Sequence, residues 1–236
     1  MNEVSKMPFF GYYLDPTWLL LLPAILLSAW AQWQVSSSFN RYARTLSAGG
    51  WTAAAMARRM LDSHGLSSVQ VIETKGNLTD HYDPKRKVLA LSQSVYGYSS
   101  LAALGVAAHE VGHAVQHAQG YRPIAWRSAL VPVTNLGSSL SWPLLLAGLI
   151  FSFRPLVTAG IVLFALVVLF QLVTLPVEFN ASSRALAMLE GDGYLQRQEI
   201  GGAKAVLRAA ALTYLASALM AVLQLVRLVL ISRNRD

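Results

Sequence analysis

Residues 155–177 read PLVTAGIVLFALVVLFQLVTLPV and contain no charged side chain. The hydrocarbon core of a bilayer is about 30 Å thick, and a helix of about 20 apolar residues crosses it. Residues 128–153 are also free of charge, so only Arg154 interrupts the two runs. The sequence therefore predicts a helical hairpin over residues 128–177, whose arms are two membrane spans and whose tip is Arg154 and Pro155.

Two other segments are apolar enough to enter a membrane. Residues 16–40 carry no charge, and their Trp18, Trp30 and Trp33 suit a membrane–water interface. A cleaved signal peptide would have a basic segment before the apolar run and a small-residue cleavage site after it. Neither is present, so we expect the first membrane span here. Residues 205–231 predict a C-terminal hydrophobic helix.

The composition of the whole chain agrees with a membrane protein. Hydrophobic residues make up 54% of the 236 residues and charged residues 13%, against about 25% charged in an ordinary soluble domain. We therefore expect a mainly α-helical, integral membrane protein with about four hydrophobic helices, forming a single domain over residues 1–236.

The net charge of +7 is unevenly distributed along the chain. Ten Lys and Arg residues lie between the first and second predicted spans and four follow the third, whereas the hairpin tip holds Arg154. Positive loops stay on the cytoplasmic side, so we expect a bacterial inner or cell membrane protein whose polar region faces the cytoplasm. Arg227, Arg233 and Arg235 break this rule if residues 209–230 cross the bilayer, which leaves the fourth span undecided. No basic block is interleaved with aromatic residues, which argues against nucleic acid as a partner.

The polar region covers residues 41–127. Thr52 can cap a short amphipathic helix that ends near Gly65. The segment NLTDHYDPKRKVLALS (77–92) alternates and has a turn at Asp83-Pro84-Lys85, which predicts a small β-hairpin.

The same region contains an H-E-x-x-H motif, formed by His109, Glu110 and His113 within AAHEVGHAVQHAQG (107–120). Residues four apart lie on one face of a helix, so both imidazoles can bind one zinc ion, and catalytic zinc keeps a position open for water. Glu110 can act as the general base for that water, whose pKa zinc lowers to about 7. The alternative is a polar stripe on a surface helix. Against it, the small residues before the motif and Gly112 suit close packing with another backbone.

A catalytic zinc site needs a third protein ligand, and the chain has no cysteine to supply it. The candidates are His117, Asp80, His81 and Glu178. His117 is two helical turns from His109, about 12 Å along a straight helix, which is too far for one ion. The hairpin returns Glu178 to the side of the histidine pair, and Pro176 allows a new helix, over residues 178–204, to begin there. Glu178 is equally explained as a first-turn acid that the helix dipole favours.

Four stretches of this sequence resemble the YugP-type membrane-bound neutral zinc metallopeptidases: LTDHYDP (78–84), HEVGHAVQHAQGY (109–121), SALVPVTNLGSSLSWPLL (128–145) and FQLVTLPVEFNASSRAL (170–186). The resemblance runs from about residue 12 to about residue 231. The layout is more distantly similar to the gluzincin group that contains the CAAX prenyl proteases, in which a glutamate on a later helix is the third ligand. It implies a zincin-like helical region that binds one zinc through His109, His113 and Glu178, with Glu110 as the base of a membrane endopeptidase.

The resemblance also raises questions about the neighbouring side chains. The distant group places an Asp four residues after its ligand glutamate, where this chain has Ser182. Ser182 or Asn180 can still hydrogen-bond a ligand histidine, and Arg184 can steady a substrate carbonyl or carboxylate, unless it is simply solvated. His81 and His117 are candidates to stabilise an oxyanion, although a structural hydrogen bond explains each equally well.

The expected substrates are peptides or membrane proteins near the bilayer. An exposed edge strand at 78–82 or 87–92 would bind an extended peptide as an added strand. One rival function is a scaffold or assembly factor with structural or inactive zinc, which would not need Glu110. The other is a metal transporter, which is disfavoured because no ionisable residue lies in the middle of a span.

Overall fold

The computed structural model describes residues 16–233 of the chain. Its helices and strands are, in order, the 3₁₀ helix η2 (Pro16–Leu21), α1 (Leu22–Tyr42), α2 (Ala53–Ser63), β1 (Gln70–Thr74), β2 (His81–Asp83), β3 (Val88–Ser92), α3 (Leu101–Ala118), α4 (Arg122–Ile150), α5 (Arg154–Gly191) and α6 (Ile200–Arg233).

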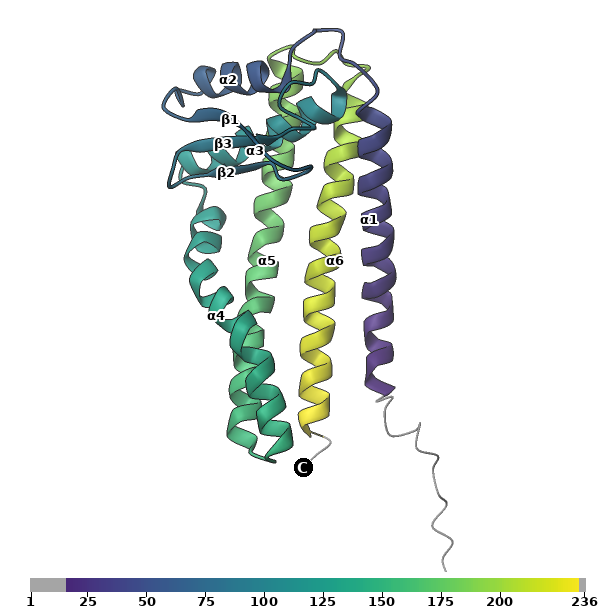
Figure 1. The fold of residues 1–236 in the computed structure, drawn as a ribbon, viewed down its shortest axis with the longest axis vertical. Helices are drawn as coiled ribbons and strands as arrows, with labels where there is room; N and C mark the ends of the chain where they lie inside the picture. Colours follow the sequence, from purple (N-terminus) through teal and green to yellow (C-terminus); the bar gives the residue numbers. More distant parts are fainter. Residues whose placement is uncertain (1–15, 234–236) are drawn as a thin grey trace, which may run out of the picture.

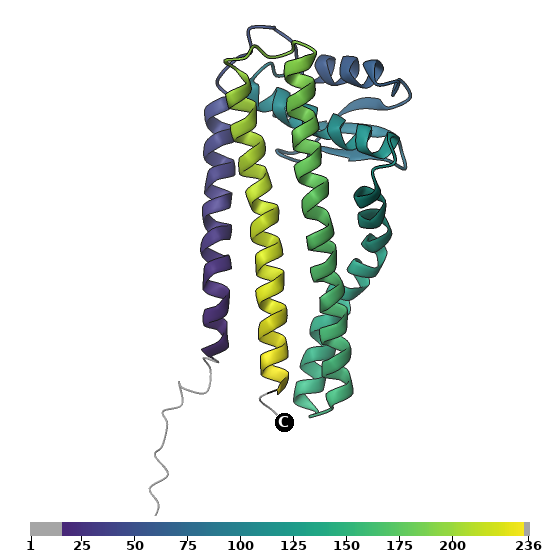
Figure 2. The ribbon, with the colours of Figure 1, turned by 180° about the vertical axis from the view of Figure 1, so that it is seen from behind.

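Four long helices lie side by side along the long axis of the molecule, and the other elements gather at one end of them (Figures 1 and 2). Each of the four, the first counted from Thr17 to Tyr42, is long and apolar enough to cross a membrane. The prediction of a mainly α-helical integral membrane protein with four hydrophobic helices is confirmed. The C-terminal helix, whose crossing the sequence left undecided, has the same length and apolar character as the others.

Helices α4 and α5 form the predicted hairpin, but its turn lies at residues 151–153, and Arg154 and Pro155, the expected tip, form the first turn of α5. A Cβ on Gly160 of α5 would lie 2.9 Å from the Ser141 oxygen of α4, so the two backbones approach closely near the tip. Helix α4 contains Pro132 and Pro143, and a proline bends a helix because it lacks an N–H and its ring pushes on the preceding turn. Nearer the polar end, α4 diverges from α5, and the first turns of α4 lie close to the sheet (Figure 1).

The prediction that a new helix begins after Pro176 is wrong. Helix α5 runs without interruption from Arg154 to Gly191, with Pro176 inside it. An interior proline costs about 3 kcal/mol of helix stability. The buried residues on both sides of it, Thr174, Val177 and Glu178, pack against the rest of the protein and hold the helix together. The third span and the helix that carries Glu178 are therefore one rigid element.

The polar end is built on a three-stranded sheet in the order β1-β3-β2. The predicted hairpin is confirmed as β2 and β3, which pair antiparallel, and Asp83 closes its turn by accepting hydrogen bonds from the backbone N–H groups of Lys85 and Arg86. Strand β1 pairs with β3 in parallel, which the sequence did not predict. Every residue of β3 is buried, so this strand is central and not the exposed edge considered for residues 87–92.

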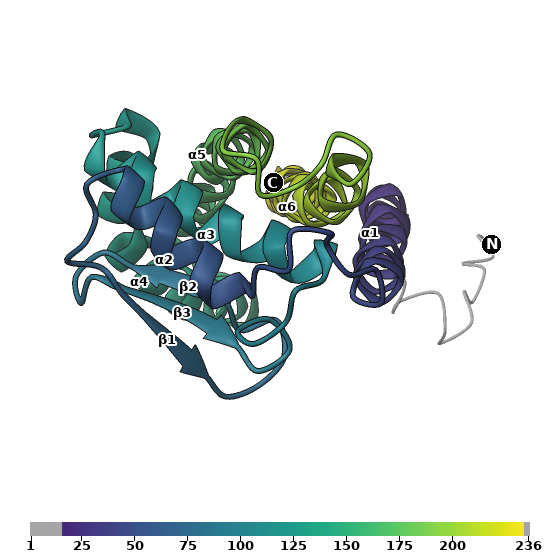
Figure 3. The ribbon, with the colours of Figure 1, turned by 90° about the horizontal axis from the view of Figure 1, so that it is seen from above.

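Helix α3 lies between the sheet layer and the long helices, and it crosses α5 and α6 (Figure 3). The Ser100 side chain caps its start by accepting a hydrogen bond from the Ala103 N–H. Helix α2, which Thr52 caps as predicted, packs against both α3 and β1. A core of fully buried side chains joins these layers: Met56, Met60, Leu61, Leu89, Leu91, Leu104 and Val111. Burial on nearly all sides fixes the direction in which α3 presents its polar residues.

Candidate metal centre

Helices α3 and α5 bring three metal-binding side chains together. Glu178 Oε2 of α5 lies 3.2 Å from His109 Nε2 and 3.5 Å from His113 Nε2, both of α3. One ligand atom from each residue lies within 4.8 Å of the other two. The three side chains expose only 13%, 11% and 3% of their surface, in the order His109, His113, Glu178. The structure thus brings together the three residues that the sequence comparison proposed as ligands.

The close approach of the two helices depends on Gly112. A Cβ at this position would lie 2.7 Å from the backbone oxygen of Ala181 on α5, closer than real Cβ contacts. Gly112 lies between the two histidines, and Ala181 is one helical turn beyond Glu178. The absence of a side chain here lets the ligands on α3 reach the ligand on α5, as the sequence predicted for Gly112.

Hydrogen bonds from α5 orient the first histidine. Ser182 Oγ lies 3.2 Å from His109 Nδ1. When Nε2 of a histidine binds a metal, Nδ1 carries the ring proton and can donate it, which fixes the tautomer and the plane of the ring. Ser182 therefore occupies the orienting position that an aspartate holds in the more distant group.

A second polar side chain, Gln116, orients His113. Gln116 Oε1 lies 3.0 Å from His113 Nδ1. The amide nitrogen of the fully buried Gln116 donates to the Val177 oxygen at 2.8 Å and to Asn180 Oδ1 at 2.9 Å. A glutamine has two donor protons and a carbonyl acceptor, and all of them are used here. Gln116 thereby ties the second ligand histidine to the turn of α5 that holds Glu178.

Arg184 takes part in this bracing network. Its Nε donates to Asn180 Oδ1 and its guanidinium NH1 donates to Gln119 Oε1, both at 2.7 Å. It does not line the cavity beside the histidines. Its hydrogen bonds direct the Arg184 side chain along α5 toward the end of α3, and the contact with a substrate carbonyl or carboxylate stays a prediction.

The electrostatics of the cluster favour a positive charge at its centre. Burial alone would lower the pKa of His113, but hydrogen bonds to Glu178 and Gln116 and the nearby negative charges of Glu178 and Glu110 raise that pKa above the ordinary value of a histidine. The same acidic groups that retain a proton here would attract a divalent cation. The donor set of two imidazoles and one carboxylate is one that zinc uses in catalytic sites. These residues therefore fit a zinc ion.

A cavity of about 220 Å³ opens over the cluster and contains the candidate base. Glu110 is buried and lines this cavity beside both ligand histidines. Within residues 16–233 its carboxylate makes no hydrogen bond or ion pair. An unpaired carboxylate next to a metal position is free to accept a proton from a water molecule that enters the cavity.

The cavity lining also includes polar residues that the sequence analysis did not name, among them Arg127 of α4 and Tyr214 of α6. The guanidinium NH2 of Arg127 lies 3.8 Å from Glu178 Oε1, and its buried Nε has no hydrogen-bond partner among the described residues. Arg127 is one of ten basic residues in the polar region and Tyr214 is in an apolar span, so neither carries a signal in the sequence. The bend of α4 and the packing of α6 bring them to the site.

The remaining candidates line the cavity without joining the ligand cluster. His81 Nδ1 lies 2.9 Å from the Thr79 oxygen, and the His117 ring meets Tyr82 edge-on at 6.2 Å between centroids. Asp80 accepts hydrogen bonds from the Ser92 N–H and hydroxyl at 2.7 and 2.9 Å, so it holds the sheet together. None of the three belongs to the group of ligand atoms at Glu178.

Comparison with known proteins agrees with this geometry. The family model described as "Putative neutral zinc metallopeptidase" matches residues 17–233. The chain is 46% identical over 215 residues to the "Putative membrane protease YugP" of Bacillus subtilis (strain 168), which covers 91% of this chain and 96% of that protein. No solved structure matches the chain. The match spans almost all of the described residues and includes every side chain of the candidate centre, and the chain therefore belongs to this zinc metallopeptidase family.

Proposed function

We propose that this protein is a membrane-embedded, zinc-dependent endopeptidase that cleaves peptide bonds with Glu110 as general base. The observation that carries the proposal is the convergence of His109, His113 and Glu178 within 4.8 Å beneath a cavity that Glu110 lines. A purely structural zinc site is closed by four protein ligands. Here three ligands meet, and the fourth side faces a space large enough for water and part of a substrate.

The roles of the residues follow from their positions. A zinc ion held by His109, His113 and Glu178 would act as a Lewis acid, lowering the pKa of a water molecule to about 7 and polarising a carbonyl group. Glu110 accepts a proton from the water as its oxygen attacks the carbonyl carbon. The C–N bond then breaks, and Glu110 delivers the proton to the leaving amine nitrogen. Proton transfer of this kind contributes about 10²- to 10⁴-fold in rate.

Arg127 and Tyr214 can stabilise the negative charge that develops on the carbonyl oxygen, because both side chains carry hydrogen-bond donors. Both line the same cavity as Glu110, and Arg127 keeps a buried Nε without a partner in the described chain. A donor preorganised toward a developing oxyanion is typically worth about 10²- to 10³-fold in rate. We therefore assign oxyanion stabilisation to Arg127 and Tyr214, a role for which the sequence analysis considered His81 and His117.

The edge of the sheet offers a way to bind an extended peptide. Strand β2 pairs only with β3 within the sheet, so its other edge is open. His81, Tyr82 and Pro84, in and just after this strand, line the cavity. A peptide added beside β2 would use main-chain hydrogen bonds and place an interior bond over the ligand cluster. This arrangement favours an endopeptidase acting on unfolded or membrane-protein segments close to the bilayer, on the cytoplasmic side that the positive charges favour.

The test compares zinc content and hydrolysis of casein and of membrane peptides for wild type, Glu110→Gln and Glu178→Ala in detergent. Glu110→Gln keeps its zinc and loses about 10²- to 10⁴-fold in rate, because only the proton acceptor has changed. Glu178→Ala loses zinc and activity together. The control is Glu190→Ala, an exposed acid of the same helix outside the site, which retains both.

Two results would contradict the proposal. Full zinc occupancy in Glu178→Ala would show that another residue, such as His117 or Asp80, is the third ligand. Zinc-loaded wild-type protein that hydrolyses no peptide, with Glu110→Gln still supporting the cellular role, would favour the scaffold function.

A further inference from the structure

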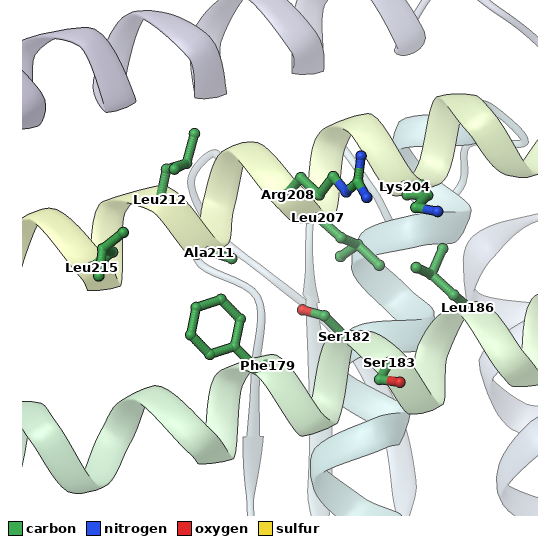
Figure 4. Close-up of a pocket in the computed structure, with 10 residues that line it drawn as sticks. All are labelled: Phe179, Ser182, Ser183, Leu186, Lys204, Leu207, Arg208, Ala211, Leu212 and Leu215. Carbon is green, nitrogen blue, oxygen red and sulfur yellow. The ribbon is translucent and has the colours of Figure 1, made fainter.

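A second hollow lies between α5 and α6, outside the zinc cavity. It is a groove of about 620 Å³ (Figure 4). Within residues 16–233 its lining comes from these two helices: Phe179, Ser182, Ser183, Leu186, Lys204, Leu207, Arg208, Ala211, Leu212 and Leu215. We call this hollow the α5–α6 groove.

The lining of the α5–α6 groove changes character along its length. Lys204 and Arg208 lie in the first turns of α6, next to the polar end of the molecule, and Leu212 and Leu215 lie farther along the same helix toward the middle of the bundle (Figures 1 and 4). Phe179 of α5 faces α6 at this deeper end. The groove is therefore cationic where the membrane surface would lie and apolar where acyl chains would lie.

The two cations are available to a ligand. Both Lys204 and Arg208 are exposed, and neither makes a hydrogen bond or ion pair with a described residue. Among the described residues, no acidic side chain lines the groove. Two exposed cations above an open apolar surface match an amphipathic anion, because the head would pair with the cations while the tail covers exposed carbon.

We propose that the α5–α6 groove binds one anionic phospholipid of the membrane leaflet on the polar side of the protein. Its phosphate lies between Lys204 and Arg208, and an acyl chain follows Phe179, Leu212 and Leu215. Ser182 and Ser183 also line the groove, and their hydroxyl groups can donate to the ester oxygens of the glycerol backbone.

The size of the groove favours a lipid over a substrate helix. A helix with its side chains is about 10–12 Å across and rises 5.4 Å per turn, so each turn occupies about 400–600 Å³. A groove of about 620 Å³ would therefore hold little more than one turn. A single acyl chain and a phosphate need less width and more length, which an open groove between two long helices supplies.

The proposed lipid would contact the support of the metal centre. Ser182 lines the groove and also lies 3.2 Å from His109 Nδ1. If His109 Nδ1 donates to Ser182 Oγ, the serine proton remains free for the lipid. The proposal concerns binding alone and does not depend on hydrolysis, so it can succeed or fail independently of the proposed function.

The experiment measures binding of fluorescent phosphatidylglycerol and of the matching phosphatidylcholine to zinc-loaded protein in a zwitterionic detergent. The test variant is Lys204→Gln/Arg208→Gln. Its matched control is Arg44→Gln/Arg197→Gln, which removes two exposed cations outside the groove. A basic residue near a membrane surface contributes about fivefold to anionic lipid affinity. We therefore expect the test variant to bind phosphatidylglycerol about 30-fold more weakly, and the control to bind as wild type does.

A second variant tests the apolar part without changing charge. Ala211→Phe fills the groove, and it should weaken binding of phosphatidylglycerol while zinc content stays at the wild-type level. Equal affinity of the test and control charge variants would overturn the proposal, as would unchanged binding to Ala211→Phe. Displacement of the lipid by millimolar inorganic phosphate would identify a phosphate site instead. Tighter binding of a membrane peptide than of the lipid, lost in Ala211→Phe, would make the groove a substrate site.

Discussion

At the scale of single residues, substitutions of Ser182 measure how much its hydroxyl group contributes to zinc binding by orienting His109. Its Oγ is the hydrogen-bond partner of His109 Nδ1, and loss of such a partner typically weakens metal affinity about 10- to 100-fold. Ser182→Ala should therefore bind zinc that much more weakly in a chelator competition, while Ser183→Ala binds it normally. Ser182→Asp should recover the affinity, since a carboxylate is a stronger acceptor. Equal zinc affinity in all of these variants would mean that Ser182 has only a packing role.

A pH prediction belongs to His113. Its pKa lies above the ordinary value, and zinc must displace the proton that it holds. Zinc affinity should therefore fall as the pH is lowered, and the fall should begin at a higher pH than an unperturbed histidine would cause. Gln116→Ala removes one of the hydrogen bonds that raise this pKa, so the fall should begin at a lower pH even though the affinity at pH 8 is reduced. An unchanged pH profile of zinc binding, measured from pH 5.5 to 8, would contradict this account.

The site residues that could be predicted from the sequence are mainly those that belong to a short sequence motif. The spacing of His109, Glu110 and His113 identifies them as a motif. Glu178 could be identified as a ligand only from the predicted hairpin together with the resemblance to a family. Gln116, Arg127 and Tyr214 could not be found in the same way, because each reaches the site through packing of separate helices. Gln116 had one available signal: it lies one helical turn after His113, on the face that meets α5.

At the scale of elements, the contact between α3 and α5 gives a prediction about Gly112. Gly112→Ala would force a Cβ to 2.7 Å from the Ala181 oxygen. Backbone atoms cannot move aside as a flexible side chain does, so we expect a loss of about 1–3 kcal/mol in stability, despite the better helix propensity of alanine. The separation of the helices should also remove Glu178 from the histidines and lower the zinc content.

The matched control for this prediction is Gly105→Ala on the same helix. Its Cβ would lie 3.4 Å from Ala203, an ordinary van der Waals contact. Gly105→Ala should keep the zinc content and the melting temperature of the wild type. A Gly112→Ala protein that binds zinc and melts as Gly105→Ala does would show that the helix contact has room to adjust.

Other elements explain where prediction from sequence stops. Hydropathy sufficed for the four long helices, and turn residues sufficed for the hairpin at Asp83. The parallel pairing of β1 with β3 was missed because β3 is buried along its whole length and lacks an alternating pattern. The break expected at Pro176 was also wrong, because tertiary packing around Glu178 outweighs the local preference of proline.

At the scale of the whole molecule, the charge distribution and the path of α6 disagree. Fourteen basic residues lie in residues 41–127 and 178–208, against Arg154 at the hairpin tip. Arg227 and Arg233 nevertheless lie toward the far end of α6, which ends beside the hairpin tip (Figures 1 and 2). Orientation follows the larger excess of positive charge. We therefore expect the polar end to face the cytoplasm and α6 to cross the membrane completely.

The absence of cysteine makes this orientation directly measurable, because each introduced thiol is the only one in the chain. Ser68→Cys reports on the polar end, Ser152→Cys on the hairpin tip and Ser232→Cys on the end of α6. A membrane-impermeant maleimide should label positions 152 and 232 in intact cells, and position 68 only after the cells are permeabilised. Labelling of position 68 alone in intact cells would reverse the orientation. Labelling of positions 68 and 232 under the same condition, with 152 on the other side, would mean that α6 does not cross.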